Sequence, residues 1–225
     1  MRRFFARRAS EAGSGSGASS GSGRARPVVD RTSILAPHPA GTPARSGPRP
    51  LFHVVLHEPQ IPNNTGNIGR TCVATGCSLH LIHPLGFRTD EKACRRAGLD
   101  YWPRLNVREH PSYEAFAGGL AGRRPWYLTT RSPRSVFDVE LLAGDFLVFG
   151  NESSGLPERI LSQAGERAVS LPMVPAERSL NLATVVCAVV FEGVRQLIGK
   201  QIVFVQSDGR LGHGPLAKNA SPEKA

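Results

Sequence analysis

A short apolar strand that runs into a polar, glycine-rich loop is the feature that most constrains the fold of this chain. Residues 146–149 (Phe-Leu-Val-Phe) are all large and apolar, as in a strand buried on both faces of a parallel sheet. Residues 150–156 (Gly-Asn-Glu-Ser-Ser-Gly-Leu) follow at once, and Pro157 suits the first turn of a helix. Ligands of open α/β sheets bind at the carboxyl ends of strands, so this loop is a candidate binding site. The alternative is an ordinary strand-to-helix turn.

The rest of the chain repeats the alternation of strand and helix. Ile68 is expected to begin the first helix, after a polar loop that contains two prolines, and Ser179 to cap the last helix. Strands that alternate with helices predict an α/β domain with a mostly parallel sheet. We expect strands at residues 51–57, 79–82, 104–108 (an edge strand), 125–130, 146–149 and 168–171, and helices at residues 68–75, 90–97, 112–120, 157–163 and 180–197.

Composition divides the 225 residues into three parts. Residues 1–50 carry nine Arg, one Glu and one Asp, which gives them +7 of the net charge of +10. They are rich in Gly, Ser, Ala and Pro and have too few large apolar residues to form a core, so we expect a disordered basic extension. An organellar transit peptide, an RNA-holding arm or a start codon assigned too early would look the same. Residues 51–200 have the composition of one globular domain, and residues 201–225 end in a polar tail.

Several common kinds of site find no support in the sequence. No Gly-x-Gly-x-x-Gly follows a predicted strand and no P-loop motif occurs, while a Gly-x-Ser-x-Gly match at residues 17–21 lies in low-complexity sequence. His80 and His83 are three apart on a strand and face opposite ways, so we interpret both as structural and expect no metal. The four cysteines form no Cys-x-x-Cys pair, which indicates reduced thiols. No apolar run reaches the length of a membrane span, about 18 residues.

Three polar segments remain, and each follows a predicted strand. They are residues 64–70 (Asn-Thr-Gly-Asn-Ile-Gly-Arg), residues 150–157 and residues 171–182. Loops at the carboxyl ends of parallel strands can converge at one edge of the sheet, so the three together are a stronger signal than any one alone. Arg70 stands on the first predicted helix. It is either a surface residue or a cation directed at a phosphate or at a developing oxyanion.

These same segments resemble the motifs of a known family, the SPOUT RNA methyltransferases. The resemblance implies a parallel α/β sheet whose C-terminal part forms a deep trefoil knot. It is closer still to the TrmL type, the small tRNA (cytidine/uridine-34) 2′-O-methyltransferases that consist of this domain alone, and it covers about residues 51–199. The family motifs match at residues 64–70, 149–157 and 179–182, and the features of the TrmL type at residues 58–62, 95–101 and 172–175.

The resemblance assigns roles to individual residues. Arg70 would be the catalytic residue, acting on the RNA and favouring the deprotonated ribose 2′-oxygen that attacks the methyl group. Where the resemblance implies Ser-Asn, this chain has Ala183-Thr184, so a hydroxyl is missing unless Thr184 or Ser179 replaces it. S-adenosylmethionine would be held, largely through backbone groups, by Leu128, Thr129, Gly150, Leu171, Met173, Ser179 and Leu180. The loops around it would be supported by Asn64, Gly66, Glu152, Gly155 and Asn181.

The implied function is methylation of the ribose 2′-oxygen of the wobble nucleotide of tRNA, position 34, by S-adenosylmethionine without a metal. The implied partners are the tRNA anticodon loop and a second copy of the chain, with no membrane, and the implied location is the cytoplasm. Two alternatives stay open: a ribosomal-RNA 2′-O-methyltransferase of the same superfamily, and a knotted RNA-binding protein without catalysis. The arginines of residues 1–50 would add affinity for phosphates of any sequence.

Overall fold

The computed structural model of the chain describes residues 33–35, 49–89 and 101–213. Most of the predicted basic extension, the helix expected at residues 90–97 and Cys94 lie outside the described residues.

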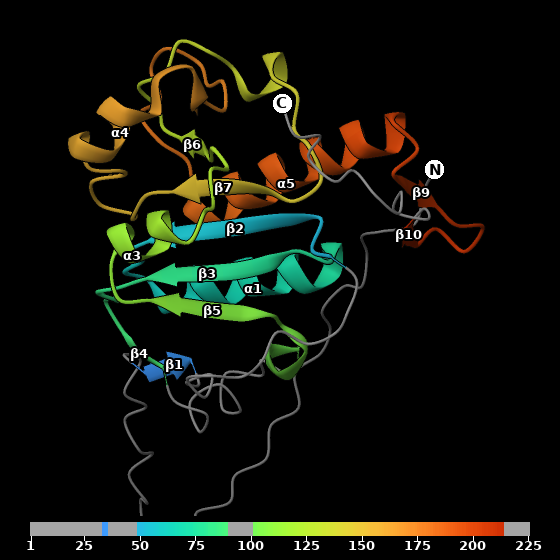
Figure 1. Cartoon of the computed structure of the whole chain (residues 1–225), viewed down its shortest axis with the longest axis horizontal. Helices are drawn as coiled ribbons and strands as arrows, with labels where there is room; N and C mark the ends of the chain where they lie inside the picture. The colour runs from blue at the N-terminus through green and yellow to red at the C-terminus, as the bar shows by residue number, and fades with distance from the viewer. Residues whose placement is uncertain (1–32, 36–48, 90–100, 214–225) are drawn as a thin grey trace, which may run out of the picture. The chain divides into compact units, whose positions relative to one another are not determined.

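Six parallel strands form the central sheet of the described region (Figure 1). Their order across the sheet is β5-β3-β2-β7-β6-β8, so the chain builds outward from β2 to one edge and then crosses to the other side. The prediction of an α/β domain with a parallel sheet is confirmed. The strands are β2 (Phe52–His57), β3 (Ser78–Ile82), β5 (Val107–His110), β6 (Trp126–Leu128), β7 (Asp145–Phe149) and β8 (Ala168–Val169).

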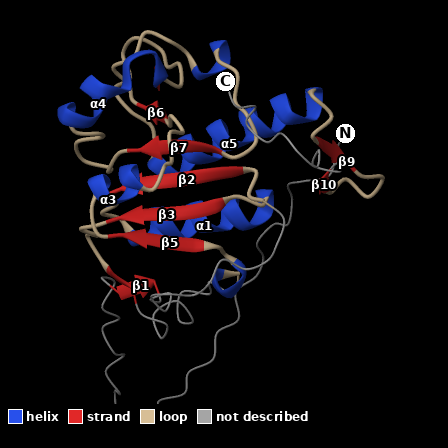
Figure 2. Cartoon of the chain, viewed as in Figure 1, coloured by secondary structure: helices blue, strands red, loops and turns tan. Residues whose placement is uncertain are grey.

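Helices cover both faces of this sheet (Figure 2). One face packs against α1 (Pro62–Thr75) and α5 (Leu182–Gly199), which also contact each other. The other face packs against α3 (Tyr113–Gly118) and α4 (Glu158–Ala164). Alternate strand residues supply the two cores, as the period of a strand requires. Short 3₁₀ helices occur at η1 (Trp102–Arg104), η2 (Val136–Asp138) and η3 (Gly165–Arg167).

The first helix begins six residues earlier than predicted. α1 starts at Pro62 rather than Ile68, so part of the expected polar loop is its first turns, with Asn64 and Gly66 buried. A proline is tolerated at this position because the N–H that it lacks would have no partner inside the helix. Gly76 ends the helix in the left-handed conformation, with a φ of 70°.

Other boundaries also differ from the predictions. Asn181, not Ser179, caps α5, and its Oδ1 accepts hydrogen bonds from the N–H groups of Ala183 and Thr184 at 2.9 and 3.3 Å. The edge strand is β5 (Val107–His110) rather than residues 104–108, because Trp102–Arg104 forms a 3₁₀ turn.

Two small sheets were not predicted from the sequence. In the segment interpreted as a tail, β9 (Val203–Val205) and β10 (Leu211–His213) form an antiparallel hairpin. β1 (Ser33–Leu35), within the segment expected to be disordered, pairs in parallel with β4 (Arg88–Thr89).

By length and composition alone, α5 passes the test for a membrane-crossing helix among the described residues. Its valine-rich face is nevertheless buried against the sheet, with Val186, Val190 and Leu197 fully covered. Gly193 lets Phe52 pack directly on the helix backbone, because a Cβ at that glycine would come within 2.5 Å of the phenyl ring. This pattern is typical of a core helix of a globular domain.

A row of three histidines crosses the sheet face under α3. His80, which is buried, makes hydrogen bonds to His53 at 3.1 Å and to His110 at 2.9 Å, and Ser78 bonds to His53 at 2.7 Å. The interpretation of His80 as structural is confirmed, and His83 pairs with Glu109 at 2.8 Å. Each contact between two histidines needs one donor and one acceptor nitrogen, which neutral imidazoles supply.

We predict that this row makes stability fall in mild acid. Burial, assisted by Arg123 and Arg108, lowers the pKa of His53 to about 4, and burial followed by the neighbouring histidines lowers the pKa of His80 to about 2. In the unfolded chain these groups take up protons near pH 6.5, so the free energy of unfolding should be constant above that pH and decrease as pH falls towards 4.

Chemical unfolding between pH 8 and pH 4 measures the effect. His80→Gln should flatten the pH dependence, whereas His83→Gln, at a half-exposed position outside the row, should retain it. A wild-type unfolding free energy that does not change between pH 7 and pH 4.5 contradicts the prediction.

Candidate functional site

A cavity of about 620 Å³ lies at the carboxyl ends of β6 and β7. Three segments distant in sequence form its walls: residues 128–131, residues 149–156 and the stretch from Leu171 to Val185; Ile61 and Asn64 at the start of α1 complete it. The volume is in the range usual for ligand sites, about 300–1,000 Å³. β7 also lies where the strand order reverses, beside β2, and open α/β sheets bind their ligands at such points.

The structure brings most of the predicted site residues together. All seven residues assigned to the cofactor line this cavity: Leu128, Thr129, Gly150, Leu171, Met173, Ser179 and Leu180. Asn64, Glu152, Gly155 and Asn181 line it too, whereas Gly66 and Arg70 do not. Ser179 lines the cavity, whereas Ala183 and Thr184 do not. Of the two hydroxyl residues considered as replacements, Ser179 and Thr184, only Ser179 therefore faces the cavity.

Sequence reasoning did not single out several other lining residues. Asn151, Ser153 and Ser154 were part of the motif at residues 149–157 but were not assigned a role, and Arg131 and Arg178 stand outside every motif. Arg131 is held by an ion pair with Glu158 at 2.7 Å.

Asn151 shapes the glycine-rich loop. Its Oδ1 accepts hydrogen bonds from the N–H groups of Ser153 at 3.1 Å and Ser154 at 2.8 Å, and its backbone carbonyl accepts from the N–H of Gly155 at 3.1 Å. Gly155 has a φ of 70°, which a side chain would strain. Gly150 is required for a different reason: a Cβ there would lie 2.0 Å from the carbonyl carbon of Gly155.

A chain of side-chain hydrogen bonds ties the loops together. The Glu152 carboxylate accepts from the backbone N–H groups of Gln60 at 2.8 Å and Ile61 at 3.2 Å, and from the Asn64 amide at 3.0 Å. The Asn181 amide in turn donates to the Asn64 Oδ1 at 3.0 Å. We call this set, Glu152, Asn64 and Asn181, the loop clamp. It satisfies the two backbone N–H groups that directly precede α1 and joins all three polar segments.

Arg70 lies further along α1. It is six residues, or about 9 Å of helix rise, beyond Asn64. Its guanidinium is exposed and stacks 4.7 Å from the ring centroid of Tyr101, whose hydroxyl donates to the carbonyl of Gly66. Gly66 therefore supports the ring on which Arg70 rests, while Arg70 itself is available to a molecule outside the cavity.

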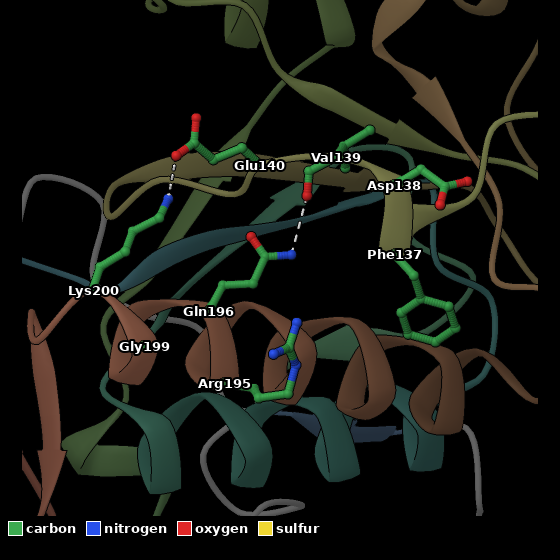
Figure 3. Close-up of a pocket in the computed structure, with 8 residues that line it drawn as sticks. All are labelled: Phe137, Asp138, Val139, Glu140, Arg195, Gln196, Gly199 and Lys200. Carbon is green, nitrogen blue, oxygen red and sulfur yellow. Dashed lines mark hydrogen bonds and ion pairs between the residues drawn. The ribbon is translucent and has the colours of Figure 1, made fainter.

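A second hollow, of about 450 Å³, lies between η2 and the end of α5 (Figure 3). Its polar side chains are used within the protein: Lys200 pairs with Glu140 at 2.6 Å and the Gln196 amide donates to the Val139 carbonyl at 3.0 Å. It contains none of the predicted site residues. No group of three or more His, Cys, Asp or Glu side chains in the described part of the chain could hold a metal ion.

We predict that the glycine-rich loop does not tolerate a side chain at position 150. Gly150→Ala places a methyl group against the backbone of residues 155–156 and should lower the free energy of unfolding by about 1–3 kcal/mol. Gly118→Ala is the matched control, since no atom lies within 4 Å of the new Cβ, and it should leave stability unchanged or raise it. Equal stabilities of the two variants in urea unfolding contradict the prediction.

Comparison with known proteins agrees with this geometry. The model of the SpoU rRNA Methylase family matches residues 51–191. The tRNA (cytidine(34)-2′-O)-methyltransferase of Saccharophagus degradans is 46% identical over 148 residues, which cover 65% of this chain and 96% of that protein. A solved structure that concerns the 2-OH methylation of C/U34 on tRNA is 44% identical with a TM-score of 0.63, over 68% of this chain and 99% of that one.

A more distant solved structure is the SpoU methyltransferase AviRb of Streptomyces viridochromogenes in complex with the cofactor AdoMet. It is 28% identical with a TM-score of 0.57, and the match covers 71% of this chain and 63% of that chain. The family match spans more than half of the chain and includes all three polar segments that build the cavity. The resemblance read from the motifs is thus confirmed, and the chain belongs to the SpoU methylase family of RNA methyltransferases.

Proposed function

We propose that this protein transfers a methyl group from S-adenosylmethionine to the ribose 2′-oxygen of nucleotide 34, cytidine or uridine, in tRNA. The observation that carries the proposal is the cavity at the ends of β6 and β7, walled by the three polar segments of a chain whose relatives act on cytidine 34 of tRNA. A ribosomal-RNA substrate is the second candidate, because the family model is named for rRNA methylases. The reaction belongs in the cytoplasm, where tRNA is modified and thiols stay reduced.

The residues of the cavity suit S-adenosylmethionine. Leu128, Leu171, Met173 and Leu180 offer an apolar surface for the adenine, and Thr129 and Ser179 offer hydroxyls for polar groups. Gly150 and Gly155 let the loop fold tightly on itself, so that its backbone forms part of the cavity wall. When bound, S-adenosylmethionine supplies an electrophilic methyl group.

Arg70 is the residue that we assign to the acceptor. A ribose hydroxyl is a very weak acid, and its oxygen gains negative charge as its proton passes to water. That charge is lost again as the oxygen bonds to the methyl carbon and the carbon–sulfur bond breaks to release S-adenosylhomocysteine. A fixed guanidinium beside that oxygen stabilises the charge. The ring of Tyr101 holds Arg70 in place, and the helix that carries it begins at the cavity wall, so RNA bound along α1 would place a ribose between the two. A single-stranded loop suits this mode of binding because its bases can be splayed out.

We also propose that the C-terminal part of the chain is threaded as a deep trefoil knot. β8 lies at the edge of the sheet, yet α5, which follows it, packs against α1. The segment from Leu171 to Asn181 therefore runs from that edge along the carboxyl ends of β6 and β7, beside the loop that begins at Leu128. A crystal structure in which this segment passes outside the loop at residues 129–136 contradicts the knot.

Methyl transfer from labelled S-adenosylmethionine to unmodified tRNA, followed by nucleoside analysis, tests the function. Label should appear in a 2′-O-methylated pyrimidine at position 34. Arg70→Ala should lower kcat about 10²–10³-fold and leave cofactor binding intact, because it removes charge stabilisation only. Arg210→Ala, an exposed arginine beyond α5, should have no effect.

The other outcomes separate the alternatives. Label in ribosomal RNA alone indicates that ribosomal RNA, not tRNA, is the substrate. Binding of the cofactor without methyl transfer to any RNA indicates a protein that has lost catalysis. Failure to bind S-adenosylmethionine overturns the proposal.

We further propose that two copies associate through the outer side of α5. Phe137 and Phe191 are 55% and 49% exposed. Phe137 lines the second hollow together with Arg195 (Figure 3). Phe191 lies one helical turn before Arg195 and so belongs to the same face of α5. Exposed apolar side chains that gather on one face mark contact sites between proteins.

Sedimentation equilibrium checks this association. The wild-type protein should be a dimer, and Phe191→Glu should give monomers because it places a charge in the contact. Phe204→Glu, at a similarly exposed phenylalanine of the β9–β10 hairpin, should remain a dimer. A wild-type protein that stays monomeric at every concentration contradicts the prediction.

A further inference from the structure

Two arginines share one buried tryptophan at the β8 edge of the sheet. The guanidinium carbon of Arg167 lies 4.3 Å from the ring centroid of Trp126, and that of Arg134 lies 5.8 Å from it. The indole is only 5% exposed and its Nε1 donates to Asp145 Oδ2 at 3.1 Å, so its position is fixed. Cation–π contacts of this kind orient both side chains before any ligand arrives.

The charges of this pair are not neutralised within the described residues. Arg134 donates to the backbone carbonyl of Glu166 at 2.9 Å, and neither arginine forms an ion pair with a carboxylate in the described part of the chain. Arg131, Arg195 and Lys200, by contrast, each have a carboxylate partner. Two like charges beside one ring repel each other, and an anion that binds both relieves the repulsion.

The backbone of Arg134 is joined to the rim of the cavity. The carbonyl of Arg134 accepts a hydrogen bond from the N–H of Ser170 at 2.8 Å, and Ser170 directly precedes Leu171 of the cavity wall. Arg131, three residues before Arg134, also lines the cavity. The two guanidiniums lie beyond this rim, against Trp126 at the first residue of β6, and form a basic edge that leads away from the cavity along β8.

We propose that Arg134 and Arg167 are positioning residues that bind phosphate groups of the RNA strand that leads away from the target nucleotide. The proposal rests on the function proposed above. Guanidinium is the side chain that suits phosphate best, since its planar donors match the phosphate oxygens. Stacking of an RNA base on Trp126 does not compete, because the indole is buried and both arginines lie against it.

Binding of tRNA to the full chain as a function of salt tests the proposal. The double variant Arg134→Gln/Arg167→Gln should reduce the slope of log K against log salt by about 0.7–0.9 for each lost phosphate contact. KM for tRNA should rise about tenfold or more near 0.1 M salt, while kcat at saturating tRNA and the affinity for S-adenosylhomocysteine stay within about twofold. The charge-preserving variant Arg134→Lys/Arg167→Lys should keep most of the slope.

Arg123→Gln is the matched control. Its guanidinium also lies over an aromatic ring, 5.5 Å from the centroid of Phe146, but its backbone N–H bonds to the carbonyl of Leu120 after α3 and not to a loop of the cavity. This variant should leave the salt slope unchanged. If the double variant keeps the wild-type slope, or lowers stability, kcat and cofactor affinity together without changing it, the pair only fastens loops and the proposal is overturned.

Two further results separate this proposal from the proposed function. If the wild-type protein binds tRNA but transfers no methyl group, the slope still decides the role of the arginines while the proposed reaction fails. If the wild-type protein binds no RNA, both proposals are overturned.

Discussion

The loop clamp is the interaction on which the rest of the site depends. One carboxylate, Glu152, takes up two backbone N–H groups at the start of α1 and the amide of Asn64, and Asn64 passes the connection to Asn181 at the start of α5. Hydrogen bonds to an ionised acceptor are about twice as strong as neutral ones. Loss of any member would leave the others without partners in a partly buried place, which costs more than the bond itself contributes.

The clamp also explains why glycines and amide side chains line the part of the cavity nearest the starts of α1 and α5. Loops that must meet the starts of two helices at hydrogen-bond distance have little room, and Gly150 shows the limit, since its neighbour's backbone occupies the place of a side chain. Arg131 and Arg178 line the cavity, and further positive charge lies outside it, on Arg70 of α1 and on the arginines along the β8 edge.

Apolar patterns in the sequence predicted most of the sheet and the last helix. Residues such as Val148 and Val190 belong to runs or periodic repeats of apolar residues, and such a pattern indicates burial without knowledge of the rest of the fold. The start of α1 was not predictable in this way. Pro62 begins a helix because Glu152, ninety residues away, satisfies the N–H groups before it. The cap of α5 was wrongly predicted at Ser179. Ser179 and Asn181 are both suitable capping residues, and only the fold shows that Asn181 caps the helix.

The candidate site, too, could be predicted only in part from the sequence. The motifs predicted most residues of the cavity wall, because the tight loops of the site themselves require glycines and amide side chains. They did not indicate how far Arg70 stands from the cavity, nor that Arg134 and Arg167 meet on Trp126. Those distances depend on how strands and helices are packed, and no local pattern records them.

The span of the clamp has a consequence for the order of events during synthesis. Asn64 and Asn181 are 117 residues apart, so the cavity closes only when the last helix has left the ribosome and docked on the sheet. Contacts of such long range form late and slow the folding of a domain. A nascent chain that already contains most of the sheet would therefore have no cavity, and competence to bind a small molecule would report that folding is complete.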